Sequence, residues 1–325
     1  MTKVILSNEH GKDVSDMRAA YCEAMMQLAE QDDRIVALDA DLMAAMGMKP
    51  FAKKYPERTV DCGIQESNMV GVACGLAVWG KIPFAHTFGP FMTRRACDQV
   101  FMSGVYNKAN VKLVGSDPGI TAAYNGGTHM PFEDMGIMRG MPTMTVIEPT
   151  DIVMLKNLLP QIAHTEGAMY MRLVRKEVRK VYAEGSTFEI GKAAQLTDGS
   201  DVTILASGYC VAESLDAVEA LEKEGISARM LNIFTWKPLD AKAILKAAAE
   251  TGAIVTAENH NVINGLGSAV AELLAKNRPT VMEMVGAQDE FGEVGPVSYL
   301  RERFGMTSDD IQAAVRKVLA RKNNS

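Results

Sequence analysis

The sequence has few of the features that mark secreted, membrane-spanning or disulfide-stapled proteins. Its five cysteines form no C-x-x-C pair, which argues against a zinc site or a disulfide framework and favours a reducing compartment. The longest apolar-looking run, residues 69–79, is far shorter than the ~20 residues that cross a bilayer. The first residues show no basic flank leading into an apolar segment. We therefore expect no export signal, no membrane contact and a cytoplasmic protein.

An excess of positive charge is also lacking. The net charge is −6, and neither nucleic acid nor an anionic membrane attracts an acidic protein. The hydrophobic share of 47% and the charged share of 23% are ordinary for a globular protein. A chain of 325 residues is about twice the ~150-residue expectation for one domain. The composition favours small-molecule chemistry in a protein of two domains.

Several well-known phosphate-binding and nucleophile motifs are missing. No G-x-G-x-x-G follows an expected strand, since residues 265–267 (GLG) lack the third glycine, and the chain has no G-x-x-x-x-G-K-[ST] or G-x-S-x-G. Dinucleotide binding, a P-loop and a hydrolase elbow are therefore not supported. Asp39 and Asp41 follow an expected strand. Two carboxylates are a weak metal signal, and a role in the loop itself is the alternative.

Short apolar runs alternate with stretches of helical period along the whole chain, which predicts an α/β fold with parallel sheets covered on both faces. Strands are expected at 34–39, 59–61, 82–86, 111–116, 143–147 and 168–173, and again at 202–206, 228–233, 253–257 and 280–284. The pattern lapses between residues 174 and 200. We predict two three-layer domains built on parallel sheets, residues 1–185 and residues 186–325.

The segment 61–71 (DCGIQESNMVG) places Glu66 at the mouth of a strand, where a helix begins. That helix carries small residues at Gly71, Ala73, Gly75 and Ala77, which allow another element to pack closely. Spacing alone also permits a simpler interpretation of Glu66, a first-turn acid that complements the helix dipole.

Five motifs, in order along nearly the whole chain, resemble the C-terminal half of a transketolase, the β-type chain of a split enzyme. They are residues 63–69 (GIQESNM), 87–91 (TFGPF) with 95–99 (RACDQ), 126–134 (GGTHMPFED), 145–149 (TVIEP) and 258–260 (ENH) leading to 265–268 (GLGS). The resemblance implies a thiamine-diphosphate pyrimidine-binding domain over residues 1–185 and a transketolase C-terminal domain over 186–325. It also implies a transferase of carbohydrate metabolism that moves a two-carbon ketol unit from a ketose to an aldose.

In this family thiamine diphosphate lies between two subunits, and the resemblance assigns roles around it. Glu66 matches the glutamate that hydrogen-bonds the pyrimidine ring and activates the cofactor. Phe88 and Phe91 match the aromatic wall for that ring, with ordinary core packing as the alternative. Asp41 matches a loop position near the thiamine. His129 matches the histidine beside the reactive carbon that holds donor hydroxyls, with loop capping as the alternative.

The same resemblance addresses substrate binding, where this sequence departs from its relatives. Arg18 and Arg175 resemble arginines that hold the substrate phosphate, and Arg172 competes with Arg175 for that match. The family's phosphate-contacting histidine is replaced by Asp117, whose carboxylate repels a phosphate unless it turns away or pairs with an arginine. Asn125 stands where an aspartate reads a sugar hydroxyl, and an amide donates as well as accepts. We expect sugar or sugar-phosphate substrates that include an unusual ketose.

The Gly-Asp-Gly motif with its later Asn-Asn, which holds the metal and the diphosphate in the family, is absent. The resemblance therefore implies a separate α-type chain that supplies Mg²⁺ (or Ca²⁺) binding, an α2β2 heterotetramer, and no activity for this chain alone. Two alternatives are the β subunit of a 2-oxoacid dehydrogenase and a non-catalytic transketolase-like partner subunit. We assign no metal ligand to this chain.

Overall fold

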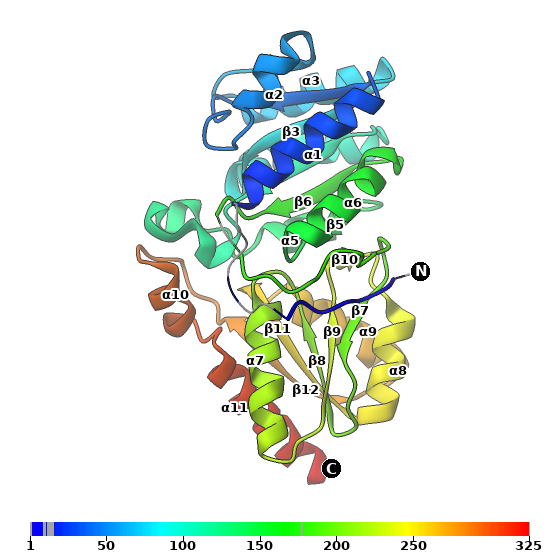
Figure 1. Ribbon diagram of the computed structural model, residues 1–325, viewed down its shortest axis with the longest axis vertical. Helices are drawn as coiled ribbons and strands as arrows, with labels where there is room; N and C mark the ends of the chain where they lie inside the picture. The colour runs from blue at the N-terminus through cyan, green and yellow to red at the C-terminus, as the bar shows by residue number, and fades with distance from the viewer. Residues whose placement is uncertain (1, 9–10, 12–15, 177, 325) are drawn as a thin grey trace.

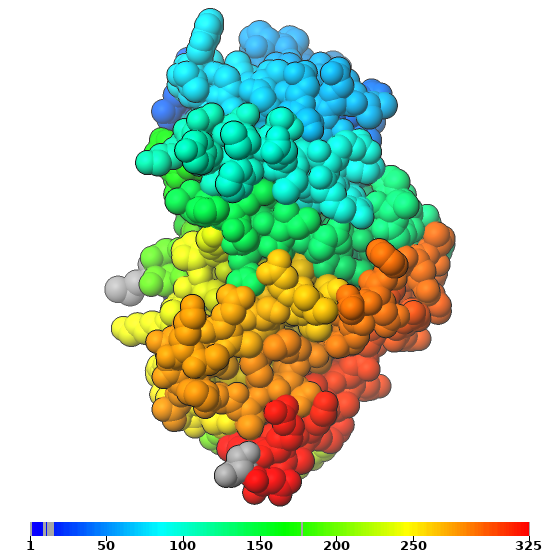
Figure 2. Space-filling model, turned by 180° about the vertical axis from the view of Figure 1, so that it is seen from behind, coloured from blue at the N-terminus to red at the C-terminus, as the bar shows by residue number. Residues whose placement is uncertain are grey.

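A computed structural model describes residues 2–8, 11, 16–176 and 178–324. The chain forms two lobes, coloured blue to green and green to red in Figure 1, and each is a sheet between layers of helices. Seen from behind, the orange part of the second lobe reaches up beside the green part of the first (Figure 2). The α/β prediction with parallel sheets is confirmed.

Among the described residues the first sheet has seven strands in the order β10-β5-β6-β4-β3-β1-β2. All neighbouring pairs are parallel except β10 with β5. The strands are β1 (Ile35–Asp39), β2 (Thr59–Asp61), β3 (Ile82–Phe88), β4 (Lys112–Ser116), β5 (Thr145–Ile147), β6 (Met169–Leu173) and β10 (Thr235–Lys237).

Helices cover both faces of this sheet (Figure 1). The α-helices are α1 (Met17–Gln31), α2 (Lys49–Lys54), α3 (Glu66–Val78), α5 (Asp134–Gly140) and α6 (Ile152–His164). The stretch after β3 winds through η2 (Phe91–Arg95), α4 (Cys97–Gln99) and η3 (Val100–Tyr106), where η2 and η3 are π-helical. Short 3₁₀ turns are η1 (Pro56–Arg58), η4 (Gly119–Asn125) and η5 (Gly127–His129).

The second sheet has five strands within the described residues, in the order β12-β11-β8-β9-β7. They are β7 (Ala194–Thr197), β8 (Val202–Ala206), β9 (Ala228–Asn232), β11 (Ala253–Asn261) and β12 (Val281–Ala287). The helices are α7 (Cys210–Lys223), α8 (Ala241–Thr251), α9 (Leu266–Asn277), α10 (Val297–Arg303) and α11 (Ser308–Asn323). None of the described helices has both the length and the apolar character needed to span a bilayer.

The structure differs from the sequence prediction at the sheet edges. β7 and β10 were not predicted, and each is a short antiparallel edge strand. β10 comes from the second half of the chain and pairs Thr235 with Ile147. It therefore extends the first sheet across the predicted domain boundary. β3 also runs two residues further than predicted, to Phe88.

The strands of the first sheet are buried because helices cover both faces. β1, β3, β4 and β6 are buried at every residue. One of these residues is His86, whose ring contacts the Tyr21 hydroxyl at 2.7 Å and the Leu38 carbonyl at 2.9 Å. Complete burial lowers the pKa of His86 to about 4. His86 is therefore a neutral histidine of the core.

We expect His86 to make the fold sensitive to acid. Its unfolded pKa is ~6.5, so below that pH the unfolded chain binds a proton that the folded chain excludes, and stability is lost from pH 6.5 toward pH 4. His86→Gln removes this site. The slope of unfolding free energy against pH in this window should be shallower in the variant, by up to about 1.4 kcal/mol per pH unit. Urea unfolding at several pH values measures it. A half-exposed control, His164→Gln, should retain the steep wild-type slope; equal slopes for His86→Gln and wild type would refute the assignment.

Candidate active site

The candidate site lies at the carboxyl edge of the first sheet. β1, β3, β4 and β6 are adjacent and parallel, so the residues that follow them are neighbours in space, and ligands of open parallel sheets bind beyond this edge. Thr87 Oγ1 and Ser116 Oγ, at the ends of β3 and β4, are buried and have no hydrogen-bond partner among the described residues. The edge therefore holds polar groups that nothing in the described chain satisfies.

Glu66 is the first residue of α3 and is only 1% exposed. Arg95 Nη1 donates to both of its carboxylate oxygens, at 2.7 and 2.8 Å. The Arg95 side chain is itself 46% exposed, so the pair joins a buried carboxylate to the surface. A charge-assisted contact of this kind fixes the direction of the carboxylate.

Three rings form a cluster next to this ion pair. The Arg95 guanidinium lies 4.0 Å from the centre of the Phe91 ring, a cation–π distance. The centroids of Phe88 and Phe91 are 5.8 Å apart, and His129 lies edge-on to both, at 5.8 and 5.2 Å. Residues that lie far apart in the sequence, Glu66 and His129, are thus joined through Arg95 and two phenylalanines.

His129 is half-buried in the turn η5. Its Nδ1 contacts Thr128 Oγ1 at 2.8 Å, and the Arg94 guanidinium holds the Thr128 carbonyl at 2.8 Å. The opposite nitrogen, Nε2, has no hydrogen bond within the described chain. The loop therefore orients the ring and leaves one nitrogen for a ligand.

The second domain holds the loop that leads to His129. Asn259, at the end of β11, accepts a hydrogen bond from Ile120 N at 2.9 Å and donates one to the Pro118 carbonyl at 2.9 Å. Gly119 fits beneath it, because a Cβ there would lie 2.0 Å from Asn259 Oδ1. This contact gives a physical reason for the Glu-Asn-His motif at 258–260.

A second contact covers the same loop from the other side. A Cβ at Gly127 would lie 2.2 Å from the carbonyl oxygen of Gly292. Only glycine permits the two backbones to approach so closely. Both Gly119 and Gly127 are therefore required by contacts between the domains.

Arg18 and Asp41 lie on neighbouring parts of the same edge. Arg18 is half-buried on α1, contacts Asp16 at 3.1 Å and donates to the Ala45 carbonyl at 2.9 Å. Asp41 is exposed, and its N–H donates to Asp61 Oδ1 at 3.1 Å. The buried Asp39 nearby has one oxygen without a partner among the described residues, and burial raises its pKa to about 7. No group of three or more potential metal ligands occurs in the described part of the chain.

Asp117 and Arg175 form an ion pair where β4 and β6 end. Asp117 is 1% exposed, and Arg175 contacts it through Nε at 2.7 Å and through Nη2 at 2.6 Å. Burial raises the pKa of Asp117, while the positive charges of Arg175, Lys176 and Arg18 oppose that rise. The Arg175 guanidinium also lies 4.8 Å from the centre of the Phe88 ring. Asp117 thus pairs with an arginine, one of the two arrangements expected from the sequence.

Arg172, which competes with Arg175 in the sequence, is completely buried. It forms a two-point contact with Asp134 and donates to Glu148 at 2.9 Å and to the Asn259 carbonyl at 3.0 Å. Burial disfavours its charge, but the two carboxylates outweigh that effect and raise the pKa of Arg172 further. The hydrogen-bond donors of Arg172 are therefore used within the protein. Arg175 is the better candidate for contacting an anionic substrate.

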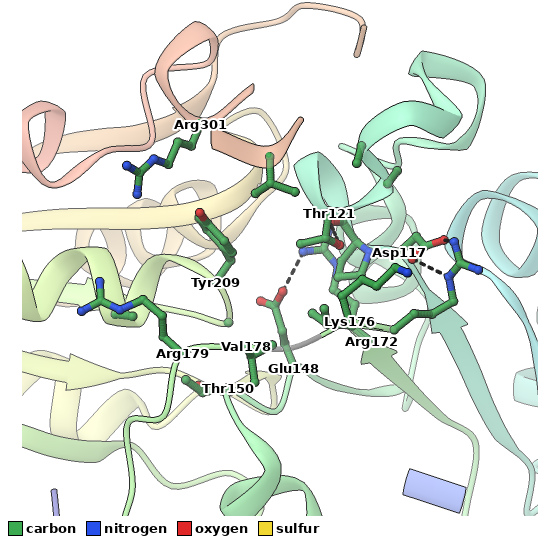
Figure 3. A pocket seen from close by; sticks show the side chains of 18 of the residues that line it. Asp117, Thr121, Glu148, Thr150, Arg172, Lys176, Val178, Arg179, Tyr209 and Arg301 are labelled. Carbon is green, nitrogen blue, oxygen red and sulfur yellow. Dashed lines mark hydrogen bonds and ion pairs between the residues drawn. The ribbon is translucent and has the colours of Figure 1, made fainter. Parts of the chain in front are cut away.

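A cavity of about 770 Å³ opens between the two domains next to the Asp117–Arg175 pair. Figure 3 shows Asp117, Thr121 and Lys176 on one wall and Tyr209 and Arg301 on the other. Asn125 and Arg175 also line it. Asp117, Asn125 and Arg175, which the sequence analysis connected with substrate binding, therefore all line one cavity.

Two residues near the site were not assigned from the sequence. Arg95 lies inside a recognised motif, but its contact with Glu66 depends on the path of η2 after β3. Asn259 also lies in a motif, and only the docking of the domains shows what it holds. No local signal in the sequence indicates either contact.

Comparison with known families matches both halves of the chain. The family described as "Transketolase, pyrimidine binding domain" matches residues 13–180, and "Transketolase, C-terminal domain" matches residues 191–311. Together the two matches cover most of the chain.

Two relatives that match over nearly their whole length are named as transketolase subunits. The chain is 52% identical to the 6-deoxy-6-sulfo-D-fructose transketolase subunit SqwH of Clostridium sp. (strain MSTE9), over 94% of this chain and 95% of that protein. It is 35% identical to an apulose-4-phosphate transketolase subunit of Phocaeicola vulgatus, over 90% of this chain and 94% of that one. A solved structure titled split gene transketolase, inactive beta4 tetramer, superimposes with a TM-score of 0.89 and 41% identity, covering 95% of this chain and 100% of that one.

The fold is that of the transketolase-type transferases, whose family cofactor is thiamine diphosphate. The chain belongs to the transketolase family and corresponds to the β-type subunit of a split enzyme, with the pyrimidine-binding and C-terminal domains.

The residues present fit that cofactor. A flat heteroaromatic ring needs an aromatic face and a hydrogen-bonding group in its plane, and Phe88, Phe91 and Glu66 offer both kinds of group. At the same edge, the buried hydroxyls of Thr87 and Ser116 have no hydrogen-bond partner among the described residues. A bound ligand would supply hydrogen bonds to such groups.

We expect Asn259 to keep the His129 loop ordered. Asn259→Ala removes both hydrogen bonds and leaves Ile120 N unsatisfied, at a cost of about 1–3 kcal/mol, whereas the Pro118 carbonyl still accepts from Thr121. Hydrogen exchange in residues 117–129 should become at least tenfold faster, because local opening becomes easier. The control Asn277→Ala changes an exposed asparagine on α9 and should leave that loop as in the wild type. Unchanged exchange in Asn259→Ala would contradict the assigned role.

Proposed function

We propose that this subunit, assembled with an α-type chain, transfers a two-carbon ketol unit from a ketose with a sulfonate group, of the 6-deoxy-6-sulfofructose type, to an aldose acceptor. The catalytic role is supported by one observation above all, the cluster that joins Glu66 to His129 through Arg95, Phe91 and Phe88. The donor class is supported by the 52% identity to a transketolase subunit named for that sugar. The relatives reported above are transketolases, which disfavours the 2-oxoacid dehydrogenase alternative.

Thiamine diphosphate, when bound, supplies the carbon nucleophile of the reaction. With the cofactor bound, Glu66 would hold and move a proton at its carboxylate facing a ring nitrogen, and Arg95 would hold that carboxylate in position. Phe88 and Phe91 form the aromatic surface against which the ring packs, and Asp41 lies at the rim of this region. His129 presents Nε2 to the hydroxyls of the donor sugar, so that the ring orients the donor and moves protons there.

The substrate end of the site is assigned to Arg175 and Asn125, which line the cavity, and to Arg18, whose charge acts on Asp117. Arg18 and Arg175 attract the anionic end of the sugar. Asn125, exposed at the end of η4, is assigned to a sugar hydroxyl, where its amide both donates and accepts. An intact glutamate, aromatic wall and histidine disfavour a non-catalytic partner role.

We propose that the α-type chain docks on the exposed face of α3 and completes an α2β2 heterotetramer. This face carries Asn68, Gly71, Gly75 and Val78, all exposed, and a Cβ at Gly71 or Gly75 would meet nothing within 4 Å. It ends at Trp79, which is 87% exposed. A smooth face of small and apolar residues at helical spacing suits close packing of a partner. The α-type chain would hold the diphosphate and Mg²⁺ (or Ca²⁺). The five free cysteines support a cytoplasmic setting.

Removing the Glu66 carboxylate should abolish most of the activity. We expect Glu66→Ala, assembled with the α-type chain, to lose at least ~10²- to 10⁴-fold in ketol transfer, the usual contribution of an acid–base group. The assay measures transfer from 6-deoxy-6-sulfofructose to an aldose with thiamine diphosphate and Mg²⁺ present. Glu57→Ala, which changes an exposed glutamate, should retain wild-type rates. Near-wild-type turnover of Glu66→Ala would defeat the assignment.

A large side chain on the exposed face of α3 tests whether the α-type chain docks there. Gly71→Arg places a long side chain on the proposed docking face, and we expect it to prevent co-elution with the α-type chain in size-exclusion chromatography while the subunit still folds by circular dichroism. The control Glu219→Arg changes an exposed residue of α7 and should co-elute. The isolated subunit should be inactive with added thiamine diphosphate and Mg²⁺. Turnover by the subunit alone, or normal assembly of Gly71→Arg, would exclude this arrangement.

A further inference from the structure

The anion end of the substrate site is built where three segments meet. β4 and β6 are parallel neighbours, and the N–H of Asp117 donates to the Leu173 carbonyl at 3.2 Å. The N–H of Met17 donates to the Lys176 carbonyl at 3.1 Å, which brings the start of α1 to the same place. Arg18, Asp117, Arg175 and Lys176 therefore form one cluster, called here the anion cluster.

The anion cluster lies one side chain away from the catalytic rings. Arg175 lies over Phe88 at 4.8 Å, and Phe88 contacts His129 with ring centroids 5.8 Å apart. A sugar whose reacting carbon is at His129 therefore extends past Phe88 toward Arg175. The far end of an extended sugar is the part that this cluster can reach.

Most of the positive charge in the anion cluster is neutralised by carboxylates. Arg175 spends two of its donor nitrogens on Asp117, at 2.7 and 2.6 Å, and Arg18 is paired with Asp16 at 3.1 Å. Lys176 has no ion-pair partner within the described part of the chain. Among the residues that the structure describes, the three cations of the cluster thus face two carboxylates, which leaves one positive charge in excess.

The other cations that line the cavity do not add to this excess, because each is paired; Arg172 is paired with both Asp134 and Glu148. Arg301 contacts Glu213 at 2.7 Å, and Arg179 forms a two-point contact with Asp216. Both are on the far side of the cavity from Asp117 in Figure 3, while Lys176 lies on its side. Lys176 is therefore the charge available to a ligand.

We propose that Asp117 makes this site selective for a terminal group with a single negative charge, a sulfonate, over a phosphate dianion. The selectivity rests on the proposed function, because it concerns the anionic end of the same substrate. A sulfonate carries one charge at neutral pH, whereas a phosphate ester, with a second pKa near 6, carries about −1.5 to −2. One excess positive charge balances the sulfonate. Because Asp117 already neutralises Arg175 in their ion pair, the second charge of a phosphate finds no further unpaired cation among the described residues of the cluster.

The test compares binding of two non-reacting ligands that differ only in that group, 6-deoxy-6-sulfoglucitol and glucitol 6-phosphate, to the α–β complex by calorimetry. We expect the wild type to bind the sulfonate at least tenfold more tightly than the phosphate at pH 7.5. At pH 5.5 the phosphate takes up a proton, and the preference should shrink several-fold. This comparison needs no variant and does not depend on turnover.

The variant Asp117→Asn keeps the size and the hydrogen-bonding oxygen of the side chain but removes its charge. We expect it to reduce the ratio of sulfonate to phosphate affinity at least tenfold at pH 7.5. Asp198→Asn is the matched control, since Asp198 is an exposed aspartate paired with Arg229 at 3.0 Å, and it should leave the ratio unchanged. Equal or tighter phosphate binding by the wild type, or an unchanged ratio in a folded Asp117→Asn, would overturn the proposal.

The two proposals fail in different ways. If 6-deoxy-6-sulfofructose supports no ketol transfer but the binding preference and its loss in Asp117→Asn are both seen, the donor is wrong and the charge selectivity stands. If transfer occurs but the ligands bind with equal affinity, the selectivity is wrong and the proposed function stands.

Discussion

The buried guanidinium of Arg172 is the contact on which the arrangement of the site depends. It joins Asp134 and Glu148 of the first domain to the Asn259 carbonyl of the second, with no exposure to water. A buried charge is costly unless it is fully paired, and removing one partner of such a pair typically costs about 3–5 kcal/mol. Every partner must therefore be in place at once, which holds the two domains in a single relative position.

The active-site loop depends on that fixed position. Asn259 follows the end of the Arg172 network and holds residues 118–120 directly, while Gly292 packs on Gly127. Glu148 extends the network to Ser207 and Trp236 in the second domain. The second domain therefore contributes to the site by shaping the loop that carries His129, even though the candidate catalytic side chains come from the first.

The site combines an aromatic reaction centre, held by the Glu66–Arg95 ion pair, with a nearly balanced anion cluster. Around Phe88, Phe91 and His129 the surfaces are aromatic, which suits a flat ring and a neutral sugar. Beyond Phe88 the charges are dense but mostly paired, and Asp117 is the residue that sets their balance. In the proposed selectivity, a single carboxylate at this position sets the charge that a substrate must bring.

The sequence by itself determined the α/β class and most strand cores, because alternating apolar runs are local signals, and its short motifs singled out Glu66, Phe88, Phe91 and His129 as candidates. It also indicated that Asp117 must avoid or pair with a neighbouring charge. The edge strands β7 and β10 were missed, since an antiparallel edge of three or four residues has too weak a pattern to recognise. Only the tertiary structure decided that Arg172 is enclosed among carboxylates while Arg175 pairs with Asp117 beside the cavity, that Arg95 holds Glu66, and that Asn259 supports the His129 loop. Each of these contacts joins segments that are far apart in the sequence. A local pattern of residues does not show which distant segments meet when the domains pack.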